Sequence, residues 1–167
     1  ITVSPASKNR MFVDGQFDAA MCPAWCAGLF ARFGGSTTSF VYSDYGVSMV
    51  GYNIVANPKY AKANPDVVKR FLAATMKAFA YSKRNQEEAL DALAKLRPKN
   101  AKPIVRKRNS GDMDDAMNFV GIAVRGKPMG YQSEKDWLAT QALLLKYDVV
   151  KEKKPISTYF TNAYIAN

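Results

Sequence analysis

Histidine is absent from this sequence of 167 residues. Histidine is the commonest general base in enzymes and a frequent metal ligand, so mechanisms of the Ser-His-Asp and Cys-His kinds are excluded within this chain. The carboxylate clusters at residues 87–88 and 112–115 are explained by helix N-termini, whose dipoles favour acidic residues. No stretch resembles a glycine-rich phosphate loop. We therefore predict that the protein is not an enzyme, and we expect no catalytic residue, cofactor or metal ion.

Cysteine is almost as scarce, because the chain has only Cys22 and Cys26, in the stretch CPAWC. Their spacing differs from the C-x-x-C of dithiol oxidoreductases, and two thiols without histidine make a poor zinc site. Residues four apart share one face of a helix, so a metal pair or a disulfide stays open. The interpretation that the residues favour is two small side chains packed in a core.

Long hydrophobic runs and an export signal are also missing. No apolar run approaches the roughly 18 residues that a membrane-spanning helix needs. The chain starts at Ile1 without an initiator methionine or a signal peptide, so we expect a processed or truncated product whose export signal has been removed. The composition, 48% hydrophobic and 23% charged, is that of one ordinary globular domain.

Positive charge is what the sequence has in excess, since 24 basic and 14 acidic residues give a net charge of +10. Such a balance suits nucleic acid, an anionic ligand or an acidic membrane surface. The densest basic stretches, residues 102–108 and 151–154, belong to no zinc-finger or RNA-binding motif. We interpret them as a solvated loop and a solvated turn, and we expect no nucleic-acid partner.

The first third of the chain indicates strands alternating with helices. Short β-branched and aromatic stretches predict strands at residues 16–22, 37–44 and 46–57. A short helix should end at Gly15, before the first strand, and a second should occupy residues 23–35 with Pro23 in its first turn. Ligands of open α/β sheets bind where strands end and helices begin, so residues 21–25 are the first place to expect a site. The pattern predicts an α/β fold.

Helix start signals dominate the rest of the chain and predict a helix-rich C-terminal half. Asn64 before Pro65, Asn85 with an acid three residues later, and Ser133 should each cap a helix. The first of these helices carries an apolar face at Val68, Phe71, Leu72, Thr75 and Phe79.

Two further elements are predicted near the end of the chain. A helix should start near Ser110, with Asp112, Asp114 and Asp115 in its first turn and a stripe of Met113, Ala116, Met117 and Val120. Residues 155–165 are expected to form a short helix or an extended tail.

The order of these elements resembles a known family, the solute-binding proteins of ABC importers of the nitrate/sulfonate/taurine and thiamine-pyrimidine type. Fungal thiamine-pyrimidine synthases share this fold. Sixteen positions match the family pattern: Gly15, Asp18, Ala19, Ala20, Asn57, Asn64, Pro65, Asp66, Val68, Phe71, Leu72, Ala73, Asn85, Glu87, Glu88 and Ala89. The stretches at residues 129–150 and 159–165, with Trp137, also match the family's C-terminal pattern.

The resemblance implies a periplasmic binding protein-like (type II) fold, in which two α/β lobes enclose a ligand cleft. The chain resembles only the later half of it. Residues 1–50 would be part of the second lobe. Residues 51–167 would hold the crossover strand and the C-terminal helices that complete the fold. A chain of this kind, taken alone as a fragment, should leave an apolar face uncovered.

The function that the resemblance implies is capture of a small solute, aromatic or anionic, by hinge closure, and its delivery to an ABC permease in the membrane. The protein would be periplasmic or extracellular, associated with the membrane through the transporter. The candidate ligand residues are Cys22, Trp25, Tyr42, Tyr52 and Asn53, which offer aromatic faces and hydrogen-bonding groups. Ordinary packing is the alternative for each of them.

An enzyme like the thiamine-pyrimidine synthases is the alternative function. That activity is expected to need a reactive histidine and a cysteine-rich segment just before the N…NP region. Here the corresponding segment, GVSMVGYNIVAN at residues 46–57, contains no cysteine. The sequence therefore favours the binding protein.

Overall fold

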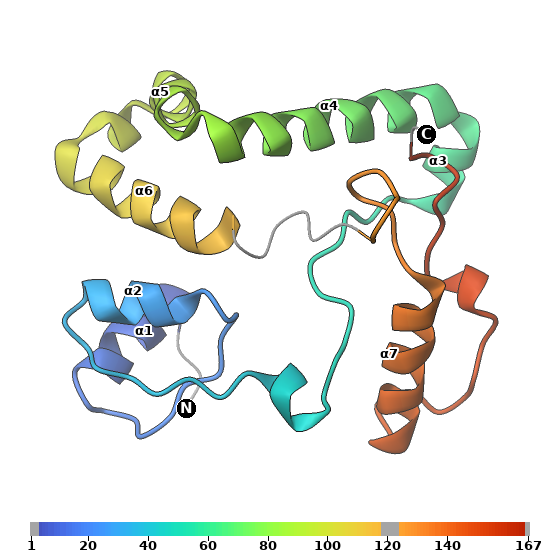
Figure 1. Ribbon diagram of the computed structural model, residues 1–167, viewed down its shortest axis with the longest axis horizontal. Helices are drawn as coiled ribbons and strands as arrows, with labels where there is room; N and C mark the ends of the chain where they lie inside the picture. The colour runs from blue at the N-terminus through green and yellow to red at the C-terminus, as the bar shows by residue number, and fades with distance from the viewer. Residues whose placement is uncertain (1–3, 118–123, 166–167) are drawn as a thin grey trace. The chain divides into compact units, whose positions relative to one another are not determined.

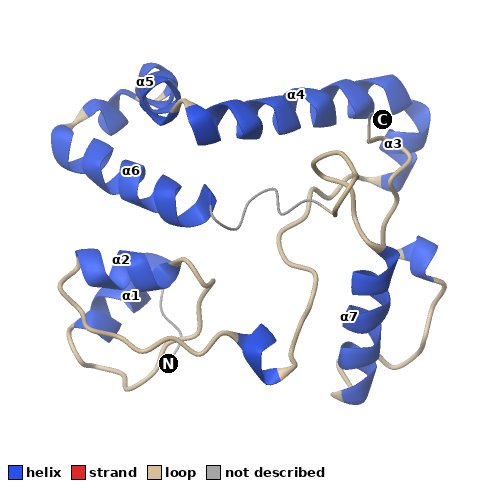
Figure 2. Ribbon diagram, in the orientation of Figure 1, coloured by secondary structure: helices blue, strands red, loops and turns tan. Residues whose placement is uncertain are grey.

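The computed structural model describes residues 4–117 and 124–165, and their regular structure is helical (Figures 1 and 2). The α-helices are α1 (Pro5–Val13), α2 (Cys26–Arg32), α3 (Pro58–Ala63), α4 (Pro65–Arg84), α5 (Gln86–Leu96), α6 (Pro103–Met117) and α7 (Glu134–Lys146). Short 3-10 helices are η1 (Tyr42–Tyr45), η2 (Pro98–Ala101) and η3 (Ile156–Thr158). The prediction of a helix-rich C-terminal half is confirmed.

The strands predicted at residues 16–22, 37–44 and 46–57 are not formed, and no strand occurs within the described ranges (Figure 2). These stretches are loops, apart from η1. A strand leaves its backbone N–H and C=O groups unpaired until a neighbouring strand binds them, and even a single hairpin is marginal in water. Strand-like side chains alone therefore do not produce strands here, and the α/β class is not confirmed.

The chain divides into two units, which we describe separately. Unit 1 comprises residues 1–40 and 82–120, and unit 2 comprises residues 41–81 and 121–167. The last turn of α4 belongs to unit 1 and the rest of the helix to unit 2. The predicted division at residue 50 refers to the complete two-lobe fold and stays a prediction.

Unit 1 packs around the rings of Phe12 and Phe30, whose centroids lie 4.8 Å apart, and around the buried Cys26. Ser4 caps α1 as its side chain accepts a hydrogen bond from the Ser7 N–H at 3.1 Å, and Pro5 fills the first helical position. A turn through Gly15, whose φ is +75°, follows α1 as predicted.

The helix predicted to start near Ser110 begins earlier, as α6 at Pro103. Proline suits a first helical position, and the Lys102 carbonyl accepts the first hydrogen bond from the Arg106 N–H at 2.9 Å. The stretch at 102–108, predicted as a solvated loop, is therefore mostly helical. Of the predicted apolar stripe, Val120 lies outside the described residues.

The acidic cluster of α6 lies towards the C-terminal end of that helix, so dipole compensation, which we predicted, does not explain it. Asp112 and Asp115 instead bind the Arg32 guanidinium of α2, at 2.5 and 2.6 Å. A side chain at Gly111 would touch Arg32, and one at Gly28 would overlap the Asp115 carboxylate. The two glycines thus allow α2 and α6 to approach closely enough for this ion pairing.

Unit 2 contains α3, α4 and α7. Asn57 caps α3 by accepting hydrogen bonds from the N–H groups of Lys59 and Tyr60, and Pro65 begins α4 as predicted. On the predicted apolar face of α4, Phe71 is 57% exposed, and none of the α4 residues is buried. Among the described residues, no helix has the length and apolarity required to cross a membrane.

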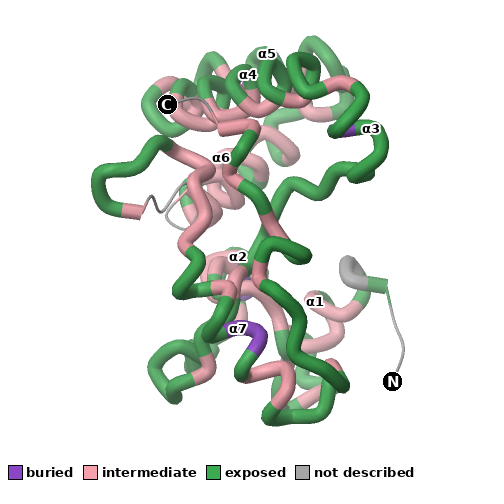
Figure 3. The backbone as a smooth tube through the Cα atoms, turned by 90° about the vertical axis from the view of Figure 1, so that its right-hand side faces the viewer, coloured by how far each residue is buried: buried purple, intermediate pink, exposed green. Residues whose placement is uncertain are grey.

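Helix α7 begins after Ser133, whose hydroxyl accepts a hydrogen bond from the Asp136 N–H at 3.4 Å, as predicted. The Trp137 ring stacks on Tyr159 and Phe160, with centroid distances of 6.3 and 5.4 Å. Residues 155–165 therefore form a short 3-10 helix and then a tail that is held against α7. Residues 36–60 are by contrast almost entirely exposed, and Figure 3 shows long exposed stretches in green beside the partly buried ones in pink.

Candidate ligand-binding site

The junction at residues 21–25, where we predicted a site, is a loop leading into α2 of unit 1. Trp25 occupies the N-cap position of α2, and the Cys26 N–H closes a turn on the Pro23 carbonyl at 2.9 Å. Lys8 donates a hydrogen bond from Nζ to the Met21 carbonyl at 2.8 Å, which brings a positive charge to the junction. The junction could therefore offer an indole face and an ammonium group to a planar or anionic ligand.

The two cysteines lie together at this junction, and both thiols are free. Cys26 is buried and Cys22 is half-buried. Burial raises the pKa of the Cys26 thiol to about 12, and the hydrogen bond with Cys22 adds to this increase, while the charge of Lys8 opposes it. Cys26 is thus a neutral thiol at physiological pH.

The described residues contain no group of three or more cysteine, aspartate or glutamate side chains that could hold a metal ion. The carboxylates of α6 bind other side chains of the protein instead of a metal ion. Arg32 binds Asp112 and Asp115, and Gln86 donates a hydrogen bond from Nε2 to Asp114 at 2.7 Å. These carboxylates tie helices together.

The other three candidates lie in unit 2, on the loop that was predicted as the crossover strand and on η1. Tyr42 is the first residue of η1, and Tyr52 is 81% exposed. The Asn53 side chain donates a hydrogen bond from Nδ2 to the Gly51 carbonyl at 2.7 Å, which fixes the local turn. The loop is attached to α7 where the Val50 N–H bonds the Thr140 hydroxyl at 2.9 Å.

The five predicted ligand residues therefore fall in two groups. Cys22 and Trp25 share the α2 junction of unit 1. Tyr42, Tyr52 and Asn53 belong to one loop region of unit 2. Their assembly into a single cleft stays a prediction.

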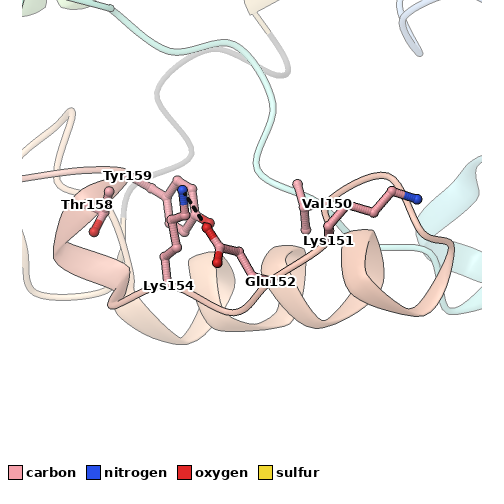
Figure 4. Close-up of a pocket in the computed structure, with 6 residues that line it drawn as sticks. All are labelled: Val150, Lys151, Glu152, Lys154, Thr158 and Tyr159. Carbon is pink, nitrogen blue, oxygen red and sulfur yellow. Dashed lines mark ion pairs between the residues drawn. The ribbon is translucent and has the colours of Figure 1, made fainter.

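A surface hollow of about 530 Å³ near the C-terminal end was not predicted from the sequence (Figure 4). It is lined by Val150, Lys151, Glu152, Lys154, Thr158 and Tyr159. The ion pair between Lys154 and Glu152 crosses it at 2.9 Å, and the hydrogen bond with Glu152 raises the pKa of Lys154. From the sequence we interpreted the basic stretch at 151–154 as a solvated turn. The aromatic residues that follow it in the sequence could have indicated that this turn lines a hollow.

The comparisons with known proteins give one match. The family model described as NMT1/THI5 like matches residues 1–89, more than half of the chain. The comparison with curated proteins and the comparison with solved structures found no match.

The matched region contains all sixteen positions on which the resemblance was based, from Gly15 to Ala89. The structure gives a physical reason for part of that pattern. Asn57 caps α3, and Asn64 with Pro65 marks the start of α4, so the N…NP spacing encodes two consecutive helix starts. Trp137 and the C-terminal stretches lie outside the matched region. The chain is a member of the NMT1/THI5-like family.

Proposed function

We propose that the chain acts in the substrate-binding component of an ABC importer, where it captures a small solute by hinge closure and delivers it to the permease. Family membership is the observation that carries the proposal, because the NMT1/THI5-like family consists mostly of substrate-binding proteins. The protein would work in the periplasm or outside the cell, associated with the membrane through the transporter.

The proposed ligand is a small molecule with a planar ring or an anionic group. Trp25, Tyr42 and Tyr52 supply aromatic faces, and stacking on such faces favours planar rings. Lys8 lies beside the Trp25 junction, and the chain as a whole carries a net charge of +10, which favours an anion.

Surface area supports the further proposal that this chain is completed by other polypeptide of the family fold. The chain exposes 12,573 Å², whereas a compact monomer of this mass exposes about 8,200 Å². Even two independent compact units of half the mass would expose only about 9,900 Å² in total. Among the described residues, buried large side chains are correspondingly few, and Phe30 and Leu90 are the largest apolar ones. We propose that the missing cover is the rest of the two-lobe fold.

The synthase-like activity known in the family is less well supported. The chain contains no histidine, and the segment at residues 46–57 contains no cysteine. No observation of the described residues favours that activity over binding.

Calorimetry on the longest natural polypeptide that carries this sequence tests the proposal. The probes are a hydroxymethyl-pyrimidine, taurine and nitrate. We expect saturable one-to-one binding of one probe, and we expect Trp25→Ala or Tyr52→Ala to weaken it at least tenfold, because a lost ring contact costs about 1.4 kcal/mol or more. Tyr147→Ala, an exposed tyrosine beyond the matched region, is the control and should leave the affinity unchanged.

Two results would contradict this proposal. If Tyr147→Ala weakened ligand binding as much as Trp25→Ala, the assignment of the binding site would be wrong. Turnover of a substrate into a pyrimidine product, with the chain consumed or recycled, would replace the binding function by the synthase.

A further inference from the structure

The two cysteines of the α2 junction carry an inference that is independent of the proposed ligand. We propose that Cys22 and Cys26 form a dithiol modification site, at which a low-molecular-weight disulfide converts the pair into an intrachain disulfide. Cys22 is the thiol that reacts first. Nothing in the family match assigns a role to either residue.

The turn that joins the two residues is the first supporting observation. The Cys26 N–H donates a hydrogen bond to the Pro23 carbonyl at 2.9 Å, so Cys22 lies directly before a tight turn that Cys26 closes. Both thiols are free, and the chain has no other cysteine, so no other intrachain pairing competes. Cys22 precedes α2 on a loop, while Cys26 is the first residue of the helix. Because Cys22 lies on this loop, a shift of the loop can bring its sulfur to bonding distance of the Cys26 sulfur without unwinding the helix.

The unequal exposure of the pair decides the order of reaction. Cys26 is only 6% exposed and Cys22 is half-buried, so an external reagent reaches Cys22 more easily. The thiolate is the nucleophile in exchange reactions, and burial keeps Cys26 as a neutral thiol. Cys26 thus serves as the resolving thiol, protected until Cys22 carries a leaving group.

The surroundings supply a positive charge. Lys8 is held at the junction by its hydrogen bond to the Met21 carbonyl, one residue before Cys22. Its charge favours thiolate at Cys26, whereas the charge of Asp112 disfavours it. The Lys8 charge therefore assists the deprotonation of Cys26 that the second exchange step needs.

The disulfide forms in two thiol–disulfide exchange steps. The Cys22 thiolate attacks one sulfur of a disulfide RSSR, forms a Cys22–S–SR bond and releases RS⁻. Cys26 then gives its proton to a thiolate and attacks the Cys22 sulfur, which forms the Cys22–Cys26 bond and expels the second RS⁻. The protein loses two electrons and two protons, and RSSR becomes two RSH.

Disulfide formation would close a ring around Pro23, Ala24 and Trp25. The position of the Trp25 ring relative to the start of α2 would then be restricted. Any consequence for ligand affinity rests on the proposed function, but the thiol chemistry does not, so the test uses no ligand.

The test treats the folded, reduced chain with oxidised glutathione and measures intact mass and alkylation over time. We expect a transient glutathione adduct at Cys22, then a product two hydrogen atoms lighter that takes up no alkylating agent. Cys26→Ala should stop at a stable adduct on Cys22. In Cys22→Ala, Cys26 should still alkylate more slowly in the folded than in the denatured chain, because burial, the largest cause of its raised pKa, remains.

Circular dichroism checks that both variants keep the helical signal. The wild-type chain alone also tests the proposal, because its intact mass identifies the product directly. A stable glutathione adduct with Cys26 still open to alkylation after denaturation would overturn the proposal. So would a product consisting only of disulfide-linked dimers, or faster alkylation at Cys26 than at Cys22 in the folded chain.

Discussion

The loop at residues 40–55 and the C-terminal region at residues 132–162 differ in how well their large side chains are covered. The loop leaves eight large side chains exposed: Phe40, Val41, Tyr42, Tyr45, Met49, Tyr52, Ile54 and Val55. The C-terminal region instead holds its tail against α7. Gln132 and Asn162 exchange two hydrogen bonds of 2.9 Å, and the Trp137 ring stacks on two aromatic rings.

The difference shows which interactions a local stretch can satisfy by itself. A helix closes its own backbone hydrogen bonds, and α7 needs only a short tail to cover its aromatic side. The loop has side chains typical of strands, but a strand needs a neighbour for its backbone and a layer for each face. The loop therefore presents the surface that the rest of the family fold is proposed to cover.

The largest expected effect that tests this comparison is at Trp137. Trp137→Ala removes both ring stacks and the hydrogen bond from Nε1 to the Gln132 side chain at 2.6 Å. We expect the free energy of unfolding of unit 2 to fall by about 3 kcal/mol, measured by urea denaturation. Val55→Ala is the control, because Val55 is 90% exposed and should change stability by less than about 0.5 kcal/mol.

The Val55→Ala variant also tests whether the loop is covered in a longer polypeptide. In a longer polypeptide in which the rest of the proposed two-lobe fold covers this loop, Val55→Ala should become destabilising by about 1 kcal/mol or more, because the side chain would then be buried. A Trp137→Ala effect no larger than that of Val55→Ala in this chain would show that the C-terminal region is as weakly held as the loop.

Much of the helical structure could be predicted because capping is local. Ser133 caps α7 as predicted, and Pro65 and Gln86 begin α4 and α5. The prediction that Asn85 caps α5 with its side chain is wrong, because that side chain makes no capping hydrogen bond, and the Asn64 side chain donates to the Tyr60 carbonyl of α3. The start of α6 was misplaced because its acidic residues resemble a first helical turn. Their true partner, Arg32, is 80 residues away along the chain, and no local pattern reveals such a pairing. Helix α3 was missed, although Asn57 and Pro58 carry the same signal as Asn64 and Pro65.

The candidate site was predictable only in part. The sequence predicted a helix after residues 21–25, and the structure places a loop there that leads into α2, with Trp25 at its N-cap. The ligand-binding role of Cys22 and Trp25 stays a prediction. The C-terminal hollow combines a basic turn with Tyr159, and its shape depends on how the tail folds back on α7. Whether the residues of the two units meet depends on contacts that no local pattern encodes.

The next largest effect concerns Cys26 and alkaline pH. Its folded-state pKa, about 12, is above the value of 9.0 for an unperturbed thiol, so the unfolded chain loses the proton first as pH rises. The stability that this group contributes is complete below pH 9 and is lost between pH 9 and pH 12. Between pH 8 and pH 10.5 we expect a loss of about 2 kcal/mol from this thiol.

Urea denaturation of the reduced chain at the two pH values measures the loss. Cys26→Ala is the matched control, because it keeps every lysine and tyrosine that also titrates in this range. The difference between the two pH slopes isolates the thiol. Parallel slopes would mean that Cys26 is solvated in the folded state, which would also remove the reason for Cys22 to react first.

The third stability effect is smaller and lies where the exposed loop meets α3, the first α-helix of unit 2. Asn57→Ala removes the side-chain oxygen that accepts from the Lys59 and Tyr60 N–H groups, so those donors lose their cap. We expect a loss of about 1 kcal/mol, with Asn57→Asp retaining most of the stability. Asn53→Ala is the matched control within the loop, since its bond to Gly51 is exposed and local, and it should cost less than about 0.5 kcal/mol. Equal losses at the two asparagines would indicate that order in this region extends back from α3 through residue 53, and the boundary between the loop and the helical part of unit 2 would then move towards Tyr52.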